Sequence, residues 1–168
     1  MKIQRLSIWF VCTLILLVIL VFSPVLFGTR ALSGTELEFL KPLYQESVQL
    51  DQVRIKTGGP LTWVYPGITL GNTISFPKGS YDQNNQKDQA LLVHEVCHVW
   101  QYQHFGLGYI PRSVWELISQ KDTYVVHYDE AKSFRNYDVE EQCEIVAEYF
   151  LTQDPRYQPY IEEIITQE

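Results

Sequence analysis

The sequence predicts an α+β protein with two function-bearing helices, and three observations lead to this prediction. Short β-like runs, separated by Gly and Pro turns, occupy residues 53–76. Helical patterns follow at 86–105 and 139–152, each with a glycine or proline after its end. An uncharged apolar run at 7–27 precedes all of these segments. We therefore expect a small antiparallel or mixed sheet packed on the first of these helices, with one transmembrane helix in front of the domain.

The apolar run 7–27 has the length of a membrane-spanning helix, because about 20 residues cross the roughly 30 Å hydrocarbon core. A cleaved signal peptide is the alternative, but it has a shorter apolar core and a small-x-small cleavage site. Lys2 and Arg5 lie before the run, and acidic residues follow Arg30. The positive-inside rule then predicts a cytoplasmic N-terminus. We expect a single-pass membrane protein whose domain lies outside the cytoplasm, in a bacterial periplasm or on the cell surface.

The remainder of the 168-residue chain is long enough for one domain but not for two. We predict an N-terminal signal-anchor at 1–30, a linker with an amphipathic helix at 31–56, and a folded domain at 57–168. The amphipathic pattern extends over 35–52 and contains Pro42, which is expected to break or bend the helix.

The net charge disfavours two kinds of binding partner, and the cysteine count disfavours a domain that relies on disulfides. The formal net charge is −7 and no basic cluster occurs, which disfavours binding to nucleic acid or to anionic lipid. The domain has two cysteines, Cys97 and Cys143, whereas exported domains that rely on disulfides usually have more. Both cysteines fall in predicted helices and are expected to be small buried apolar groups, with a disulfide between them as the alternative.

The first helix contains His94-Glu95-Val96-Cys97-His98, an H-E-x-x-H pattern. A helix advances about 100° per residue, so the two histidines share one face, where two neutral imidazoles can bind one Zn²⁺. Glu95 lies about 100° round the helix and can take the proton of a water that zinc activates for attack on a carbonyl group. The pattern therefore predicts a zinc site with Glu95 as general base.

A catalytic zinc site needs a third protein ligand, for which Glu140 and His104 are the candidates. Glu140 and Glu144 share a largely apolar face of the second helix, and buried carboxylates require a cation or a strong donor. Glu140 would bind zinc, and Glu144 would accept a hydrogen bond from a ligating histidine. His104 fits a longer pattern whose glycine is replaced here by Gln101, so a continuing helix carries it about 9 Å from His98. We favour Glu140.

These motifs resemble those of the gluzincin metallopeptidases, in which a small residue and an acidic residue follow the glutamate ligand, as in Glu140-x-x-Cys143-Glu144. In more detail, residues 68–77, 91–103 and 137–149 resemble small bacterial zincin-like proteins that are Rhs- or Vgr-related, or related to the injection-system core metallopeptidase domain. The cysteine and the second glutamate depart from the usual alanine or serine and aspartate. The resemblance implies a zincin-like fold, peptide hydrolysis, and an edge strand at 68–76 to which an extended peptide adds.

We therefore predict a membrane-anchored, zinc-dependent metallopeptidase-like protein that acts on a peptide or protein substrate. Three residues are candidates for stabilising the oxyanion: Tyr124, His127 and Tyr128. For the two tyrosines, packing with the polar tips outward is the simpler interpretation. Two alternatives stay open. One is a zinc-stabilised, non-catalytic binding or scaffold module associated with a secretion or envelope system, and the other is a metal-free interaction protein.

Overall fold

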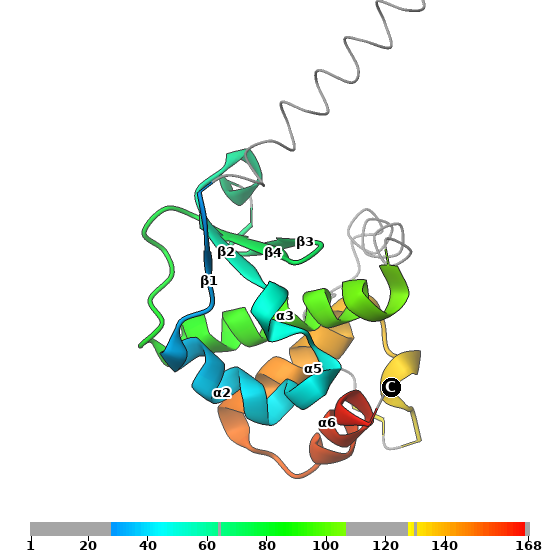
Figure 1. The fold of residues 1–168 in the computed structure, drawn as a ribbon. Coiled ribbons are helices and arrows are strands. Elements are labelled where there is room, and N and C mark those ends of the chain that lie inside the picture. The colour runs from blue at the N-terminus through cyan, green and yellow to red at the C-terminus, as the bar shows by residue number, and fades with distance from the viewer. Residues whose placement is uncertain (1–27, 64, 107–127, 130, 167–168) are drawn as a thin grey trace, which may run out of the picture.

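The computed structural model describes residues 28–63, 65–106, 128–129 and 131–166, and in these ranges the fold is α+β (Figure 1). The sheet has four short strands: β1 (Thr29–Ala31), β2 (Arg54–Thr57), β3 (Ile68–Leu70) and β4 (Thr73–Phe76). Their order is β1-β2-β4-β3. The two central strands run parallel to each other, and each edge strand is antiparallel to its neighbour. The sheet is therefore mixed, as expected.

Four α-helices lie in the described part of the chain: α2 (Gly34–Tyr44), α3 (Gln86–Phe105), α5 (Val139–Thr152) and α6 (Gln158–Ile165). Figure 1 shows α3 passing between the sheet and the group formed by α2, α5 and α6. It contacts β3 and β4 on one side and α5 on the other. The largest fully buried side chains come from α3 itself and from four other places in the chain: Trp100 on α3, Tyr44 on α2, Phe76 on β4, and Phe134 and Tyr137 ahead of α5. The H-E-x-x-H helix is thus the centre of the fold.

Local signals in the sequence explain why α3 begins and ends where it does. The side chain of Asn85 accepts hydrogen bonds from the backbone N–H groups of Lys87 and Asp88 at the N-terminus. Gly106 ends the helix with a positive φ of 62°, and its N–H donates to the carbonyl of Tyr102. The predicted range 86–105 is confirmed.

The segment expected to be a linker contributes to the same core as α3. Ser33 and Glu36 form a capping box at the start of α2. The helix ends at Tyr44, two residues after Pro42, and short 3₁₀ turns replace the remainder of the predicted helix. The hydroxyl of Tyr44, which is fully buried, donates to the carbonyl of Val93 over 2.7 Å. This hydrogen bond joins α2 to the middle of α3.

Two of the expected β segments differ from the structure. The β-like region expected at 53–76 includes a run at 61–65, but Pro60–Trp63 is a 3₁₀ turn that follows Gly58 and Gly59, both with positive φ. Residues 68–76 were expected to form one edge strand. They form the hairpin β3–β4 instead, because Gly71 with φ of 60° reverses the chain. Of these two strands, β3 lies at the edge of the sheet and β4 is internal.

The predicted fold class also placed a transmembrane helix in front of the domain, and this part is corrected. Among the residues described above, no helix is both long and apolar enough to cross a membrane. The run 7–27, on which the prediction depended, lies outside these residues. The predicted transmembrane helix, and with it the localisation as a single-pass membrane protein, has no support in the structure.

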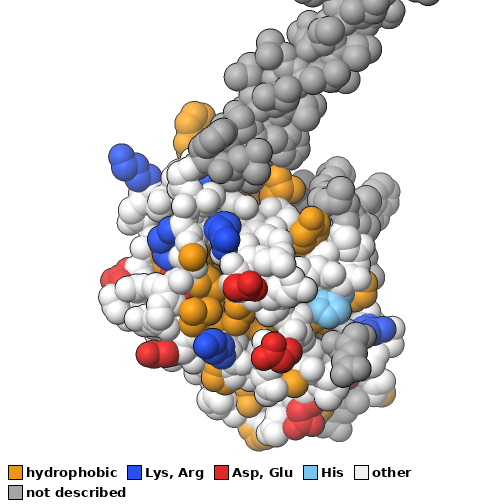
Figure 2. All heavy atoms as spheres, in the orientation of Figure 1, with side chains coloured by type: hydrophobic (Ala, Val, Ile, Leu, Met, Phe, Trp, Pro, Cys, Tyr) orange, Lys and Arg blue, Asp and Glu red, His pale blue; other side chains and the backbone are white. Residues whose placement is uncertain are grey.

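The surface in the described ranges has mixed charge. On the face shown in Figure 2, Lys and Arg side chains are interspersed with Asp and Glu, and hydrophobic side chains gather between them. Three large hydrophobic side chains are exposed in this part of the chain: Trp63, Phe105 and Leu151. This face therefore shows no broad field of a single sign.

Candidate metal centre

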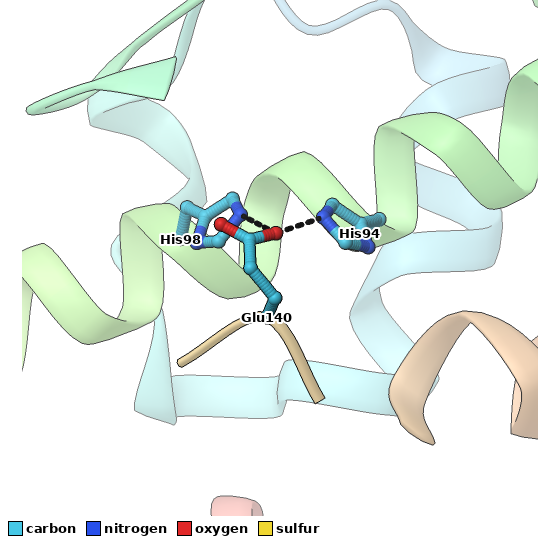
Figure 3. A group of neighbouring side chains, drawn as sticks. All are labelled: His94, His98 and Glu140. Carbon is cyan, nitrogen blue, oxygen red and sulfur yellow. Dashed lines mark ion pairs between the residues drawn. The ribbon is translucent and has the colours of Figure 1, made fainter. Parts of the chain in front are cut away.

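Helix α3 presents His94 and His98 one turn apart, with both side chains almost completely buried. Their ring centroids lie 4.9 Å apart and the ring planes meet at 77°. In this arrangement the two Nε2 atoms face a common point beside the helix (Figure 3). The spacing of four residues thus produces the shared face that the sequence pattern predicts.

Helix α5 brings Glu140 to the same point from the opposite side (Figure 3). Its Oε2 atom lies 3.3 Å from Nε2 of His94 and 3.3 Å from Nε2 of His98. Glu140 occupies the first turn of α5, which begins with a capping box between Asp138 and Glu141. The cap engages Glu141, and the side chain of the neighbouring Glu140 is directed at the two histidines.

The donor atoms suit a zinc ion. One ligand atom from each of His94, His98 and Glu140 lies within 4.8 Å of the other two. Two ligands at about 2.0–2.1 Å from a tetrahedral zinc lie roughly 3.4 Å apart, which is close to both observed distances between nitrogen and oxygen. Two imidazoles and one carboxylate are also the donor set of open, catalytic zinc sites. The residues present therefore fit zinc.

The second nitrogen of each histidine has its own partner. Nδ1 of His94 lies 3.2 Å from Oε1 of Glu144, one turn after Glu140 on α5. Nδ1 of His98 lies 2.9 Å from Oε1 of Gln101 and 3.5 Å from the sulfur of Cys143. Such contacts orient a ligating imidazole and leave its Nε2 atom free for a metal. Glu144 thus lies within reach of His94, and its role as hydrogen-bond acceptor of a zinc ligand stays a prediction.

Charge compensation dominates the electrostatics of the three residues. Burial alone lowers the pKa of His94 and His98, but hydrogen bonding to Glu140, and to Glu144 for His94, outweighs it and raises both pKa values. Burial alone raises the pKa of Glu140, yet the two imidazoles outweigh it and hold this pKa well below its usual range. The carboxylate therefore stays ionised beside positive charge, and a divalent cation supplies the same compensation.

Glu95 lies on the sheet side of α3 and is only 5% exposed. The hydroxyl of Thr69, on β3, lies 2.6 Å from Oε2 of Glu95 and 3.1 Å from its backbone carbonyl oxygen. The chain passes so close at Gly67 that a Cβ atom there would lie 2.5 Å from Oε1. The edge strand and the loop before it thus hold the carboxylate in place.

Three contributors to this centre were not found from the sequence: Gly67, Thr69 and Gln101. The first two lie almost thirty residues before Glu95 in the chain, and the packing of β3 against α3 brings them close to Glu95. Gln101 is on the same helix, three residues after His98, and is 1% exposed. A buried glutamine at that spacing is a weak signal, and in the sequence pattern Gln101 stands out only as the residue that replaces a glycine.

The other candidates lie elsewhere. Nδ1 of His104 is 2.9 Å from the carbonyl oxygen of Trp100, and its ring packs on that indole. Tyr128 packs against Tyr157 and Tyr160 near α6. Tyr124 and His127 fall outside the described residues. The two cysteines on α3 and α5, Cys97 and Cys143, are buried free thiols and not a disulfide.

Comparison with known proteins places this geometry in context. Residues 37–106 match the profile of a family described as the eCIS core domain. This match extends from α2 to the end of α3 and stops before Glu140. A second similarity is to the type VI secretion system spike protein VgrG2b of Pseudomonas aeruginosa, with 27% identity over 137 residues. It covers 73% of this chain but only 13% of that protein.

A solved structure, the effector domain of Pseudomonas aeruginosa VgrG2b, is similar in fold. Its TM-score is 0.58 at 25% identity, and the match covers 81% of this chain and 80% of that chain. The expected resemblance to Vgr-related proteins and to the injection-system core domain is confirmed. The descriptions of these relatives name neither a gluzincin peptidase nor a membrane protein. The predicted metallopeptidase class is therefore corrected to a coarser statement: a domain similar to a secretion-system effector domain, containing residues that could hold a metal.

Proposed function

We propose that this chain is a zinc-binding module related to secretion-system effectors and that its metal centre hydrolyses peptide bonds in a protein or peptide substrate. Zinc would be held by Nε2 of His94, Nε2 of His98 and the carboxylate of Glu140. The support is the 3.3 Å spacing of these atoms, which suits tetrahedral zinc, and their burial among partners that orient both rings.

Hydrolysis is the activity that the geometry supports best, and Glu95 is the observation that carries it. When bound, zinc supplies Lewis-acid chemistry to a water and a carbonyl group. Glu95 follows His94 directly and is buried, and among the described residues its carboxylate is held by the hydroxyl of Thr69 and not by a cation. It is therefore an acceptor for the proton of an attacking water and, after that, a donor to the leaving amine.

The substrate would bind along β3. This strand pairs only with β4 in the described sheet, so its outer edge can accept an extended peptide by backbone hydrogen bonding. Thr69 lies in the middle of β3 and contacts Glu95. A peptide added to this edge would therefore lie beside Glu95. A substrate segment that is not extended could not form the same backbone hydrogen bonds with β3.

The test compares the full chain with Glu95→Gln in two measurements. Zinc content should be the same in both proteins, because Glu95 is not a ligand. Cleavage of a fluorescence-quenched peptide mixture, followed by mass spectrometry of the products, should occur only with wild type. Zinc in both proteins without cleavage by wild type over many conditions would overturn the hydrolase proposal.

A zinc-stabilised, non-catalytic module is the second candidate, and the comparisons favour it. The similar proteins are described as a core domain and a spike protein, which are names for parts of an assembly. In that case zinc would stabilise the packing of α3 against α5, and an edge of the sheet would bind a protein partner. Glu95→Gln then leaves partner binding unchanged, whereas His94→Ala lowers it together with zinc content.

A further inference from the structure

Gln101 lies between the two helices that provide the zinc ligands, and its side chain contacts both. Its Oε1 atom is 2.9 Å from Nδ1 of His98 on α3. Its Nε2 atom donates to the carbonyl of Val139 and to Oε1 of Gln142 at the start of α5, each over 2.9 Å. Val139 immediately precedes Glu140, so one buried amide connects a ligating ring to the backbone beside the third ligand.

The backbone carbonyl groups that contact Gln142 determine which atom donates and which accepts in each of these hydrogen bonds. Nε2 of Gln142 lies 3.1 Å from the carbonyl oxygen of Phe134 and 3.2 Å from that of Tyr137. Carbonyl oxygens only accept, so the NH₂ group of Gln142 must face them and its Oε1 must face Gln101. The NH₂ group of Gln101 then faces two acceptors, Val139 and Gln142. Its Oε1 atom is left to face His98.

We infer that Gln101 is a positioning residue that makes His98 offer Nε2, and not Nδ1, to zinc. Oε1 of Gln101 can only accept, so Nδ1 of His98 must carry the hydrogen. In the neutral ring the lone pair is then on Nε2, the atom that lies 3.3 Å from Glu140. The orientation originates in the backbone at residues 134–137 and passes through Gln142 and Gln101 to the ring. This inference rests on the proposed zinc site, but not on hydrolysis.

The chain offers a matched control on the same helix. Gln103 also bridges α3 to other segments, with Oε1 accepting from the N–H of Gln49 and Nε2 donating to Asn72. None of these partners contacts a zinc ligand in the described structure. Gln101→Leu and Gln103→Leu therefore both remove a bridging amide from α3, but only the first removes the amide oxygen that lies 2.9 Å from Nδ1 of His98.

Zinc affinity, measured on the full chain by competition with a chromogenic chelator, tests the inference. Gln101→Leu should weaken zinc binding about 10- to 100-fold, as loss of a ligand's hydrogen-bond partner typically does. Gln103→Leu should stay within about twofold of wild type. Gln142→Leu should weaken binding less than Gln101→Leu, and the double variant should match Gln101→Leu, because both residues belong to one chain of hydrogen bonds. Equal affinities of the Gln101 and Gln103 variants would overturn the inference.

A second measurement needs no variant and so holds even if Gln101→Leu fails to fold. Long-range ¹⁵N–¹H correlation spectra of the zinc-loaded wild-type chain report which nitrogen of each histidine carries hydrogen. His98 should have a protonated Nδ1 that exchanges slowly and a metal-bound Nε2. Metal bound through Nδ1 would overturn the inference while leaving the zinc site intact. Failure of wild type to bind zinc at all would instead overturn the proposed function and this inference together.

Discussion

At the scale of single residues, three buried side chains of the candidate metal centre each contact a different kind of polar group. His94 has a carboxylate at its second nitrogen, His98 has an amide, and Glu95 has a hydroxyl. A carboxylate at both histidines would add a further negative charge to a site that already contains Glu140. The neutral amide limits the charge that a bound zinc ion would have to compensate, since unpaired buried charge is costly.

The close approach of Gly67 to Glu95 leads to a prediction about catalysis. In Gly67→Ala the new Cβ would lie 2.5 Å from Oε1 of Glu95, so the end of this flexible side chain has to move. Peptide cleavage should fall about 100-fold, which is typical of a 1 Å displacement of a catalytic group, while zinc content stays unchanged. Gly34→Ala is the matched control, since its Cβ meets nothing within 4 Å. Full activity in Gly67→Ala would contradict the role of Glu95.

The ion pair between Arg30 and Glu36 leads to a prediction about pH. Burial raises the pKa of Glu36, but two hydrogen bonds from Arg30 and one from the N–H of Ser33 outweigh it and lower the pKa below its ordinary value. A lowered pKa stabilises the fold above the pKa of the unfolded chain, and this stabilisation is lost as pH falls through the folded value. Glu36→Gln should therefore cost about 1–3 kcal/mol of unfolding free energy at pH 7.

Urea unfolding at a series of pH values measures this difference. The gap between wild type and Glu36→Gln should narrow as the pH falls from about 4.3, the pKa of glutamate in an unfolded chain, towards the lower pKa of Glu36 in the folded protein. A gap that is the same at pH 7 and pH 3 would show that the loss has another origin.

The sequence indicates site residues whose charge conflicts with an apolar helical face, but it does not indicate neutral polar residues of the site. Two carboxylates on an apolar helical face require a partner, and this requirement alone points to Glu140 and Glu144 in the sequence. Thr69 and Gln101 are common residue types with no such conflict. Their importance depends on which segments meet in three dimensions, and a single sequence does not contain that information directly.

At the scale of elements, the start of α5 determines where Glu140 lies. Asp138→Ala removes the capping side chain two residues before Glu140, so it should cost about 1 kcal/mol of stability and also weaken zinc binding. Thermal unfolding and chelator competition measure the two effects. Asp154→Ala, at a partly exposed site beyond the other end of α5, should leave zinc affinity unchanged. Loss of stability without any loss of zinc affinity would show that the cap does not position Glu140.

Elements with local end signals were predictable, and elements that depend on pairing were less so. The bounds of α3 follow from Asn85 and Gly106, which lie directly at the two ends of the helix. The run 68–76 is β-like with a turn signal at Gly71 and Asn72, but the sequence does not reveal that β4, the second half of the hairpin, is internal. The 3₁₀ turn at Pro60–Trp63 resembles a strand in its residue types, whereas Gly58 and Gly59 redirect the chain before it.

At the scale of the whole molecule, zinc would join two helices that are far apart in the chain. His94 and His98 belong to α3 and Glu140 to α5, so a metal that binds only the folded state stabilises their packing. With free zinc at about 100 times Kd, this linkage amounts to about 2.7 kcal/mol. Adding a chelator should therefore lower the melting temperature of wild type. It should have the same effect on His104→Ala and almost none on His94→Ala.

Differential scanning calorimetry with and without chelator checks this prediction. The comparison uses the zinc-dependent part of the melting temperature, because each substitution also changes packing on its own. His104 is the suitable control since it is on the same helix but packs on Trp100. A chelator effect that survives in His94→Ala would place the metal elsewhere.

The strand order β1-β2-β4-β3 has a consequence for how such a module can be joined covalently to a larger protein. Strand β1 begins at Thr29 and occupies one edge of the sheet, and β3, which contacts Glu95, occupies the other. A carrier joined ahead of Thr29 would therefore be attached on the side of the sheet away from β3. Tethering and access to the metal centre are separated by the width of the sheet, so the module can stay attached while the opposite edge remains available.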